Sequence, residues 1–355
     1  MAHHALPGLF LSALGLSLFV APAAPVEDHP SEVSRVLAAY APEVSERSPA
    51  AMAGAAQALL DALDEDHHDD CAHPLESDER GKWTNVPPRM DDAGLRLGDL
   101  DEANLKLACD LLATCLSDTG YAKVRDILLA DDLLLPEGKP RPGFGAENYW
   151  LLVFGTPSAD GRWALQLDGH HIAVNLTFDG EQVSMSPSFI GTQPARYERG
   201  DATIEPLRGE VEAAFALLES LDDGQRADAI VSDRRGRIAA GPGQDGVVPA
   251  PAGLPCSRLN EVQRVRLIGL LRHYVAGLPE PHATARLLEL KGEIDRMHFA
   301  WSGGRKQPGD VSYRLQGPSV IIEYACQDLG GDPLQHLHSM YRDPSNEYGA
   351  GFESR

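Results

Sequence analysis

The spacing of apolar residues changes along the chain and divides it into helical and strand-rich segments. Ser48 and Pro49 are a typical helix cap and first helical residue, so a helix is predicted from Ala50 to Leu63. Helical spacing also holds over Asp101–Leu116 and Tyr121–Leu134, with Gly120 as the expected break. From Asn148 the period becomes that of β-strands, and Asp179-Gly180 is typical of a hairpin turn. The pattern predicts helices followed by an antiparallel meander over about 148–187.

The second half repeats this order of helices and then strands. Helices are predicted at Pro206–Leu221, Asn260–Leu278 and His282–Arg296, and a second strand group follows at about 297–341. A segment rich in glycine and proline, Arg234–Pro255, is typical of a long surface loop. Helices and strands come in runs, which favours the α+β class. Because neither strand group alone makes a generous sheet, we expect both to join one antiparallel sheet packed with helices.

The N-terminus carries a short apolar run, Leu9–Val20, followed by the small residues Ala21-Pro22-Ala23. This order is typical of a secretory signal peptide. We therefore expect a signal peptide at 1–23, a helical and acidic lead-in at 24–82, and a single α+β domain at 83–355. The protein is predicted to be exported, to the periplasm or outside the cell.

The charge balance bears on the partners of the protein. Thirty-one Lys and Arg against 53 Asp and Glu give a net charge of −22. Such a surface repels phosphate backbones, so nucleic acid is excluded as a partner. The apolar run is short for a membrane span, so we expect no stable membrane insertion. The five cysteines are an odd number, so at least one would stay outside an intramolecular disulfide.

The stretch DGHHIAVN, residues 168–175, holds two adjacent histidines. Apolar residues are odd-numbered before Gly169 and even-numbered after it, and a β-bulge at Asp168-Gly169 would produce this change. With a bulge, His171 and Asn175 share a polar face, whereas His170 turns toward the core. His171 is therefore the candidate metal ligand, and His170 is the candidate core histidine.

A second histidine pair occurs in QHLHSMYRD. His336 and His338 are two residues apart, so on a strand both rings project from one face and can hold one metal ion. Glu323 is an acid within the apolar run VIIEY, where burial without a partner is costly. It could be a metal ligand, or it could form a salt bridge to Arg314 or Arg342.

These residues predict a mononuclear metal site with His171, His336, His338 and Glu323 as ligands. Two histidines with one carboxylate suit non-haem iron, and His/Glu sets with an open position suit zinc. Zinc would support hydrolysis, whereas iron or copper would support oxidation. The residues predicted to line the site are Asn175, Gln316 and Arg314, of which Arg314 would orient an anionic group.

Several stretches together resemble a bacterial family named domain of unknown function 3500. They are Leu116–Leu128, the strand runs NYWLLVFGTPS and RWALQLDGHHIAVNLTF, Pro187–Ala195, Phe299–Gly304, Ser312–Tyr324 and His336–Gly349. The similarity covers about Trp83 to the C-terminus. The resemblance implies that the DGHH, IEY and HLH segments belong to one domain, and it fits secretion; it implies no activity.

Two functions follow from these observations. The first is an exported metal-dependent enzyme, a hydrolase or an oxidoreductase, that uses a divalent metal ion (zinc, iron or copper) on a small-molecule or peptide substrate. The alternative is a non-catalytic envelope or ligand-binding protein without bound metal, whose histidines are hydrogen-bonded polar groups inside the sheet. A bound ion would distinguish the two.

Overall fold

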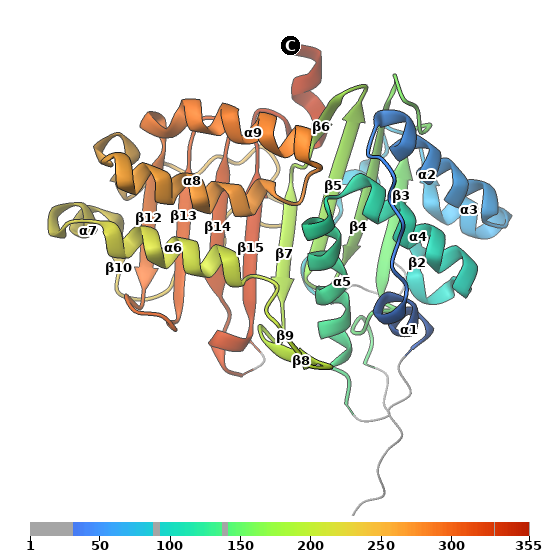
Figure 1. Cartoon of the computed structure of the whole chain (residues 1–355), viewed down its shortest axis with the longest axis horizontal. Helices are drawn as coiled ribbons and strands as arrows, with labels where there is room; N and C mark the ends of the chain where they lie inside the picture. The colour runs from blue at the N-terminus through green and yellow to red at the C-terminus, as the bar shows by residue number, and fades with distance from the viewer. Residues whose placement is uncertain (1–30, 88–92, 137–140, 330, 355) are drawn as a thin grey trace, which may run out of the picture.

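The computed structural model describes residues 31–87, 93–136, 141–329 and 331–354. One large β-sheet runs through these residues, and helices pack across one of its faces (Figure 1). The predicted α+β class is confirmed, because helices and strands form separate layers. The predicted signal peptide, residues 1–23, lies outside the described residues.

The sheet has a long path of strands in the order β1-β3-β4-β5-β7-β15-β14-β13-β12-β10, with β2, β6 and β11 paired beside it; β8 and β9 form a separate hairpin. The strands are β1 (Ala72–His73), β2 (Leu95–Arg96), β3 (Tyr149–Phe154), β4 (Arg162–Gly169), β5 (Ile172–Asp179), β6 (Gln182–Ser184), β7 (Ser188–Thr192), β8 (Tyr197–Arg199), β9 (Ala202–Ile204), β10 (Ile230–Ser232), β11 (Leu254–Pro255), β12 (His298–Gly303), β13 (Val311–Gln316), β14 (Ile321–Cys326) and β15 (Leu337–Arg342).

The two predicted strand groups do meet in one sheet, and β7 joins them. It pairs antiparallel with β5 on one side and with β15 on the other. The prediction of a wholly antiparallel sheet is wrong at two places, because β1 is parallel to β3 and β10 is parallel to β12. In both cases a pair of helices lies between the paired strands in the chain, and such crossovers are what parallel pairing requires.

Helices form two groups over the sheet. The α-helices are α1 (Glu32–Ala39), α2 (Pro49–Ala62), α3 (Glu65–Cys71), α4 (Glu102–Cys115), α5 (Asp118–Asp132), α6 (Arg208–Ser220), α7 (Asp223–Ala229), α8 (Glu261–Val275) and α9 (Glu280–Glu293). Short 3₁₀ turns are η1 (Asp78–Gly81), η2 (Leu97–Asp99), η3 (Cys256–Arg258), η4 (Ile294–Arg296), η5 (Pro333–Gln335) and η6 (Glu347–Ser354). In Figure 1, α4 and α5 lie in front of β3–β5, whereas α6, α8 and α9 lie in front of β12–β15, and β7 is visible between the two groups.

Local sequence explains where these helices begin. The Ser48 hydroxyl accepts a hydrogen bond from the Ala51 amide and Pro49 opens α2, as predicted. The break between α4 and α5 is at Leu116-Ser117 rather than at Gly120, because Ser117 caps α5. Gly120 lies inside α5, where a Cβ atom would be 2.5 Å from the Gly277 carbonyl oxygen. The missing side chain therefore lets α5 approach the end of α8.

The other face of the sheet is covered by chain without helix or strand, residues 233–253. A small second core lies beneath it, in which Trp83, Phe189, Ala240 and Met340 pack together. Arg342 is fully buried on this face and binds the Ala240 carbonyl, Asp245 and Glu347. Polar side chains of the sheet therefore anchor this loop.

All five cysteines are free and buried. Burial raises the pKa of Cys71 and of Cys256 to about 12, so these thiols stay protonated at neutral pH. No α-helix in the described residues has the length and apolar character needed to cross a bilayer.

Candidate metal centre

The histidine pair lies in a tight hairpin turn. Gly169 at the end of β4 pairs with Ile172 at the start of β5, so only His170 and His171 connect the two strands. The predicted bulge at Asp168-Gly169 is therefore wrong: the apolar parity changes because the chain reverses direction. His171 has a φ of 71°, and histidine is among the residues that tolerate this conformation better than most. Gly169 is required because a Cβ atom there would lie 2.5 Å from the Tyr149 ring.

His170 is a buried, hydrogen-bonded histidine, as the sequence predicted, but its ring does not turn away from its neighbour. The two rings stack with centroids 3.7 Å apart. Nδ1 of His170 donates to Oδ1 of Asp131 at 2.6 Å, and the other Asp131 oxygen accepts from the Gly145 amide at 2.8 Å. A buried carboxylate thus fixes His170, and the stack fixes the plane of the His171 ring.

Three imidazole nitrogens from distant parts of the chain converge next to this stack. Nε2 of His171 lies 2.9 Å from Nε2 of His336, which in turn lies 2.9 Å from Nε2 of His338. His336 directly precedes β15 and His338 lies within it, so the predicted pair does share one face of a strand. His171 and His336 are almost completely buried and His338 is half-buried. Of the four ligands predicted, the structure brings these three histidines together.

Gly191 on β7 makes this convergence possible. It lies opposite His338 in the sheet, and its amide donates to the His171 carbonyl at 2.6 Å. A Cβ atom at this position would be 2.8 Å from Cδ2 of His171 and 3.1 Å from Cδ2 of His338. The two rings can meet over β7 only because residue 191 has no side chain. Sequence reasoning missed this residue because the strand that contains it, β7, was not predicted.

The local environment keeps the three imidazoles neutral. Burial lowers the pKa of His171 and His338 well below the usual value, and neighbouring histidines lower it further. Burial also lowers the pKa of His336. Nδ1 of His336 lies 2.5 Å from the Leu329 carbonyl oxygen, which only accepts, so Nδ1 carries the proton and Nε2 has a free lone pair. Neutral imidazole with a directed lone pair is the form that binds metal ions.

Glu323 is engaged elsewhere on the same face of the sheet. It pairs with Met340 in the register, whereas His338 pairs with Ala325. Its Oε2 accepts from the Ala239 and Ala240 amides at 2.7 and 2.8 Å, and a guanidinium nitrogen of Arg314 lies 3.9 Å from Oε1. Burial raises the pKa of this carboxyl, and the two amides oppose that effect. The carboxylate therefore anchors the loop and is not part of the histidine cluster within the described residues.

The residues predicted to line the site also contact the main chain. Arg314 donates to the Ala250 carbonyl and Gln316 to the Pro249 carbonyl, both in the covering loop. Asn175 donates to the Pro187 carbonyl at 2.8 Å, just before β7. The structure places these three side chains at loop and strand connections rather than against the three Nε2 atoms.

The arrangement has the donor set of a transition-metal site. Tetrahedral ligand nitrogens at about 2.0–2.1 Å from zinc lie roughly 3.3–3.4 Å apart. The observed 2.9 Å separations thus need only a few tenths of an ångström of ring movement to admit an ion. Hydrogen bonds between the three rings do not account fully for both contacts. Nε2 of His336 has a single lone pair, and that lone pair faces both His171 and His338. Asp131 and Gly191 complete the site and were not predicted.

The fold and this cluster define an α+β protein with a three-histidine group that can bind a metal ion. A family model described as "Protein of unknown function (DUF3500)" matches residues 45–350, and the chain belongs to this family. The resemblance noted in the sequence is therefore confirmed over nearly the whole chain. No curated protein and no solved structure matches the chain.

Proposed function

We propose that the protein binds one transition-metal ion through Nε2 of His171, His336 and His338. The observation that carries this proposal is the convergence of three imidazole nitrogens, two from buried rings and one from the half-buried His338, with two 2.9 Å separations. Support comes from the Leu329 carbonyl, which directs the His336 lone pair inward. Metal-ligating histidines usually donate their other nitrogen to such a carbonyl or to a carboxylate.

The same geometry supports a catalytic role over a purely structural one. Three protein ligands leave a coordination position for water or substrate, whereas structural zinc sites are closed by four. Zinc at this site would lower the pKa of a bound water to about 7 and supply a nucleophile for hydrolysis. Copper or iron would supply oxidation instead. The enzyme would act on a small molecule or an exposed peptide group that reaches the half-buried His338.

Export is part of the proposal. The apolar run at Leu9–Val20 and the small residues after it support secretion to the periplasm or beyond. The net charge of −22 supports partners other than nucleic acid. In such a compartment the site would load from ions available outside the cytoplasm.

Metal stoichiometry tests the proposal. The purified chain is stripped with a chelator, titrated separately with Zn²⁺, Co²⁺ and Cu²⁺, and analysed for ions per chain by mass spectrometry. We expect one ion per chain, and its loss in the double variant His336→Ala, His338→Ala. The matched control is His67→Ala, His68→Ala, which removes two adjacent, partly exposed histidines of α3 and should bind as the wild type does.

A wild-type chain that takes up none of the three ions would refute the proposal, as would a His336, His338 double variant that binds normally. The catalytic part has its own test, with hydrolysis of 4-nitrophenyl acetate by the zinc form and aerobic oxidation of a phenol by the copper form. A loaded protein inactive in both assays would refute the catalytic part and leave metal binding as the function.

A further inference from the structure

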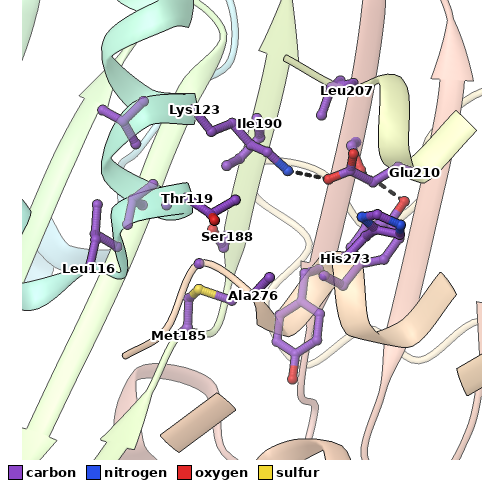
Figure 2. A pocket seen from close by; sticks show the side chains of 17 residues that line it. Leu116, Thr119, Lys123, Met185, Ser188, Ile190, Leu207, Glu210, His273 and Ala276 are labelled. Carbon is purple, nitrogen blue, oxygen red and sulfur yellow. Dashed lines mark hydrogen bonds and ion pairs between the residues drawn. The ribbon is translucent and has the colours of Figure 1, made fainter. Parts of the chain in front are cut away.

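A second candidate site lies on the opposite face of the sheet, in the seam between the two helix groups. On β7 and β15, Ser188, Ile190, Ser339 and Tyr341 face this seam, whereas the alternating residues Gly191 and His338 face the histidine cluster. The seam holds a narrow cleft of about 50 Å³ between α5, α6 and α8, open to solvent (Figure 2).

Most of the cleft wall is apolar. Leu116 at the end of α4, Val124 on α5, Val174 and Ile190 on the sheet, and Met185 form this wall. Thr119 is exposed at the start of α5 and also lines the cleft. The two helix groups thus leave an apolar gap between them that their own side chains do not fill.

One buried ion pair interrupts this apolar wall. Lys123 on α5 donates to the Glu210 carboxylate on α6, across the seam (Figure 2). The Glu210 side chain is only 4% exposed and that of Lys123 is 17% exposed. Apolar side chains of similar volume often stabilise such a position as well as or better than an ion pair does. A paired positive and negative group at an apolar cleft is therefore more easily explained by recognition than by stability.

Hydroxyl groups continue the polar part of the cleft. Ser339 donates to the Tyr274 hydroxyl at 3.1 Å, which lies 2.7 Å from the Tyr313 hydroxyl. Burial raises the pKa of Tyr274, so its hydroxyl remains protonated. The cleft therefore offers hydrogen-bond donors and acceptors beside an apolar wall.

We propose that this cleft binds a small, mainly apolar molecule with one uncharged hydrogen-bonding head group, such as an alcohol or a primary amide. The apolar part packs along Leu116, Val174 and Met185, and the head group lies beside Lys123 and Glu210. An anionic head is repelled by Glu210 and a cationic head by Lys123, whereas a neutral head can accept from one and donate to the other. The site is independent of the metal centre.

Calorimetric titration with four eight-carbon probes tests the inference: 1-octanol, octanamide, octanoate and octylamine. Octanol and octanamide should bind, and octanoate and octylamine should bind at least tenfold more weakly. Shortening the alcohol should weaken binding about fourfold for each methylene removed. Glu210→Gln leaves the lysine charge without its partner, so octanoate should become the preferred probe.

Thr119→Trp should block the cleft from its exposed rim and abolish binding without changing the melting temperature of the free protein. Its matched control is Thr284→Trp, at an exposed position of α9 that does not line the cleft. The inference is overturned if none of the four probes binds the wild type, if the charged probes bind best, or if Thr119→Trp binds as the wild type does. None of these results involves the metal ion, so they leave the proposed function untouched.

Discussion

The imidazole of His170 stacks on that of His171 with ring centroids 3.7 Å apart, inside a hairpin turn that consists of these two residues alone. His170 is held by Asp131, and His171 points at His336. The pair therefore combines a hydrogen-bonded histidine with a candidate ligand in one rigid unit.

Loss of the stack should weaken metal binding. His170→Ala frees one face of the His171 ring, and we expect the affinity for Zn²⁺ to fall by about tenfold, within the range seen when groups that orient ligands are removed. The double variant His170→Phe, Asp131→Asn restores an aromatic face and neutralises the carboxylate, so it should recover most of the affinity. Competitive titration with a chromogenic chelator measures both. Equal affinity in the alanine variant would show that the stack does not orient His171.

A methyl group at residue 191 should separate the rings. Gly191→Ala places Cβ 2.8 Å from His171 and 3.1 Å from His338, so we expect at least a tenfold loss of zinc affinity. Overpacking should also lower the free energy of unfolding by about 1–3 kcal/mol. Gly269→Ala is the control, because nothing lies within 4 Å of that position on α8. Unchanged affinity in Gly191→Ala would mean that the rings can shift without loss of the site.

Acid should destabilise the metal-free protein. The pKa values of His171, His336 and His338 lie below the usual 6.5 in the fold, so each imidazole takes up a proton on unfolding at lower pH. Above pH 6.5 the three imidazoles are neutral in both the folded and the unfolded state, so they do not lower the free energy of unfolding. As the pH falls from 6.5 toward the folded pKa values, the free energy of unfolding decreases by about 1.4 kcal/mol per pH unit for each imidazole.

Urea unfolding at pH 7.5, 6.5 and 5.5 with a chelator present measures this effect. The variant His336→Gln, His338→Gln should show a flatter dependence. A free energy of unfolding of the wild type that is larger at pH 5.5 than at pH 6.5 would contradict this prediction.

Arg342 should be essential for the covering loop. Its side chain is fully buried and its three nitrogens bind Glu347, Ala240 and Asp245. Arg342→Met leaves these partners unmatched, and we expect a loss of about 3 kcal/mol in the free energy of unfolding. Limited proteolysis should then cut within residues 233–253. Arg342→Lys should rescue little, because an ammonium cannot reproduce the guanidinium geometry.

Glu323 should behave as a loop anchor rather than as a metal ligand. Glu323→Gln keeps an oxygen for the Ala239 and Ala240 amides and removes a charge whose burial raises the carboxyl pKa. Zinc affinity should stay within about twofold of the wild type. A tenfold loss would instead place the carboxylate among the ligands, as the sequence suggested.

Periodicity was sufficient to predict the parts of the fold that depend on local pattern. The strand that holds His338 was predicted within the run QHLHSMY, and the start of α2 was visible in Ser48-Pro49. The turn at His170 and His171 was missed because Asp168-Gly169 was interpreted as a bulge within one strand rather than as the start of a turn. Its tolerance of a φ of 71° comes from tertiary contacts, among them a hydrogen bond from the Tyr149 hydroxyl to the His170 carbonyl.

Asp131 and Gly191, which support the three histidines, could not be predicted from the sequence for a different reason. Asp131 is an acid at the end of an amphipathic helix, where exposure is the ordinary expectation, yet it is 1% exposed. Gly191 lies in a strand that was not predicted at all. Both matter only because β5, β7 and β15 are neighbours, and sheet order depends on contacts between segments far apart in the chain.

The hairpin turn and the start of β15 are 165 residues apart in the chain, yet their imidazoles share one point. During synthesis the first ring leaves the ribosome long before the other two exist. All three nitrogens can therefore bind one ion only after β15 has been synthesised and has paired with β7. A bound ion would then indicate that this part of the sheet has folded.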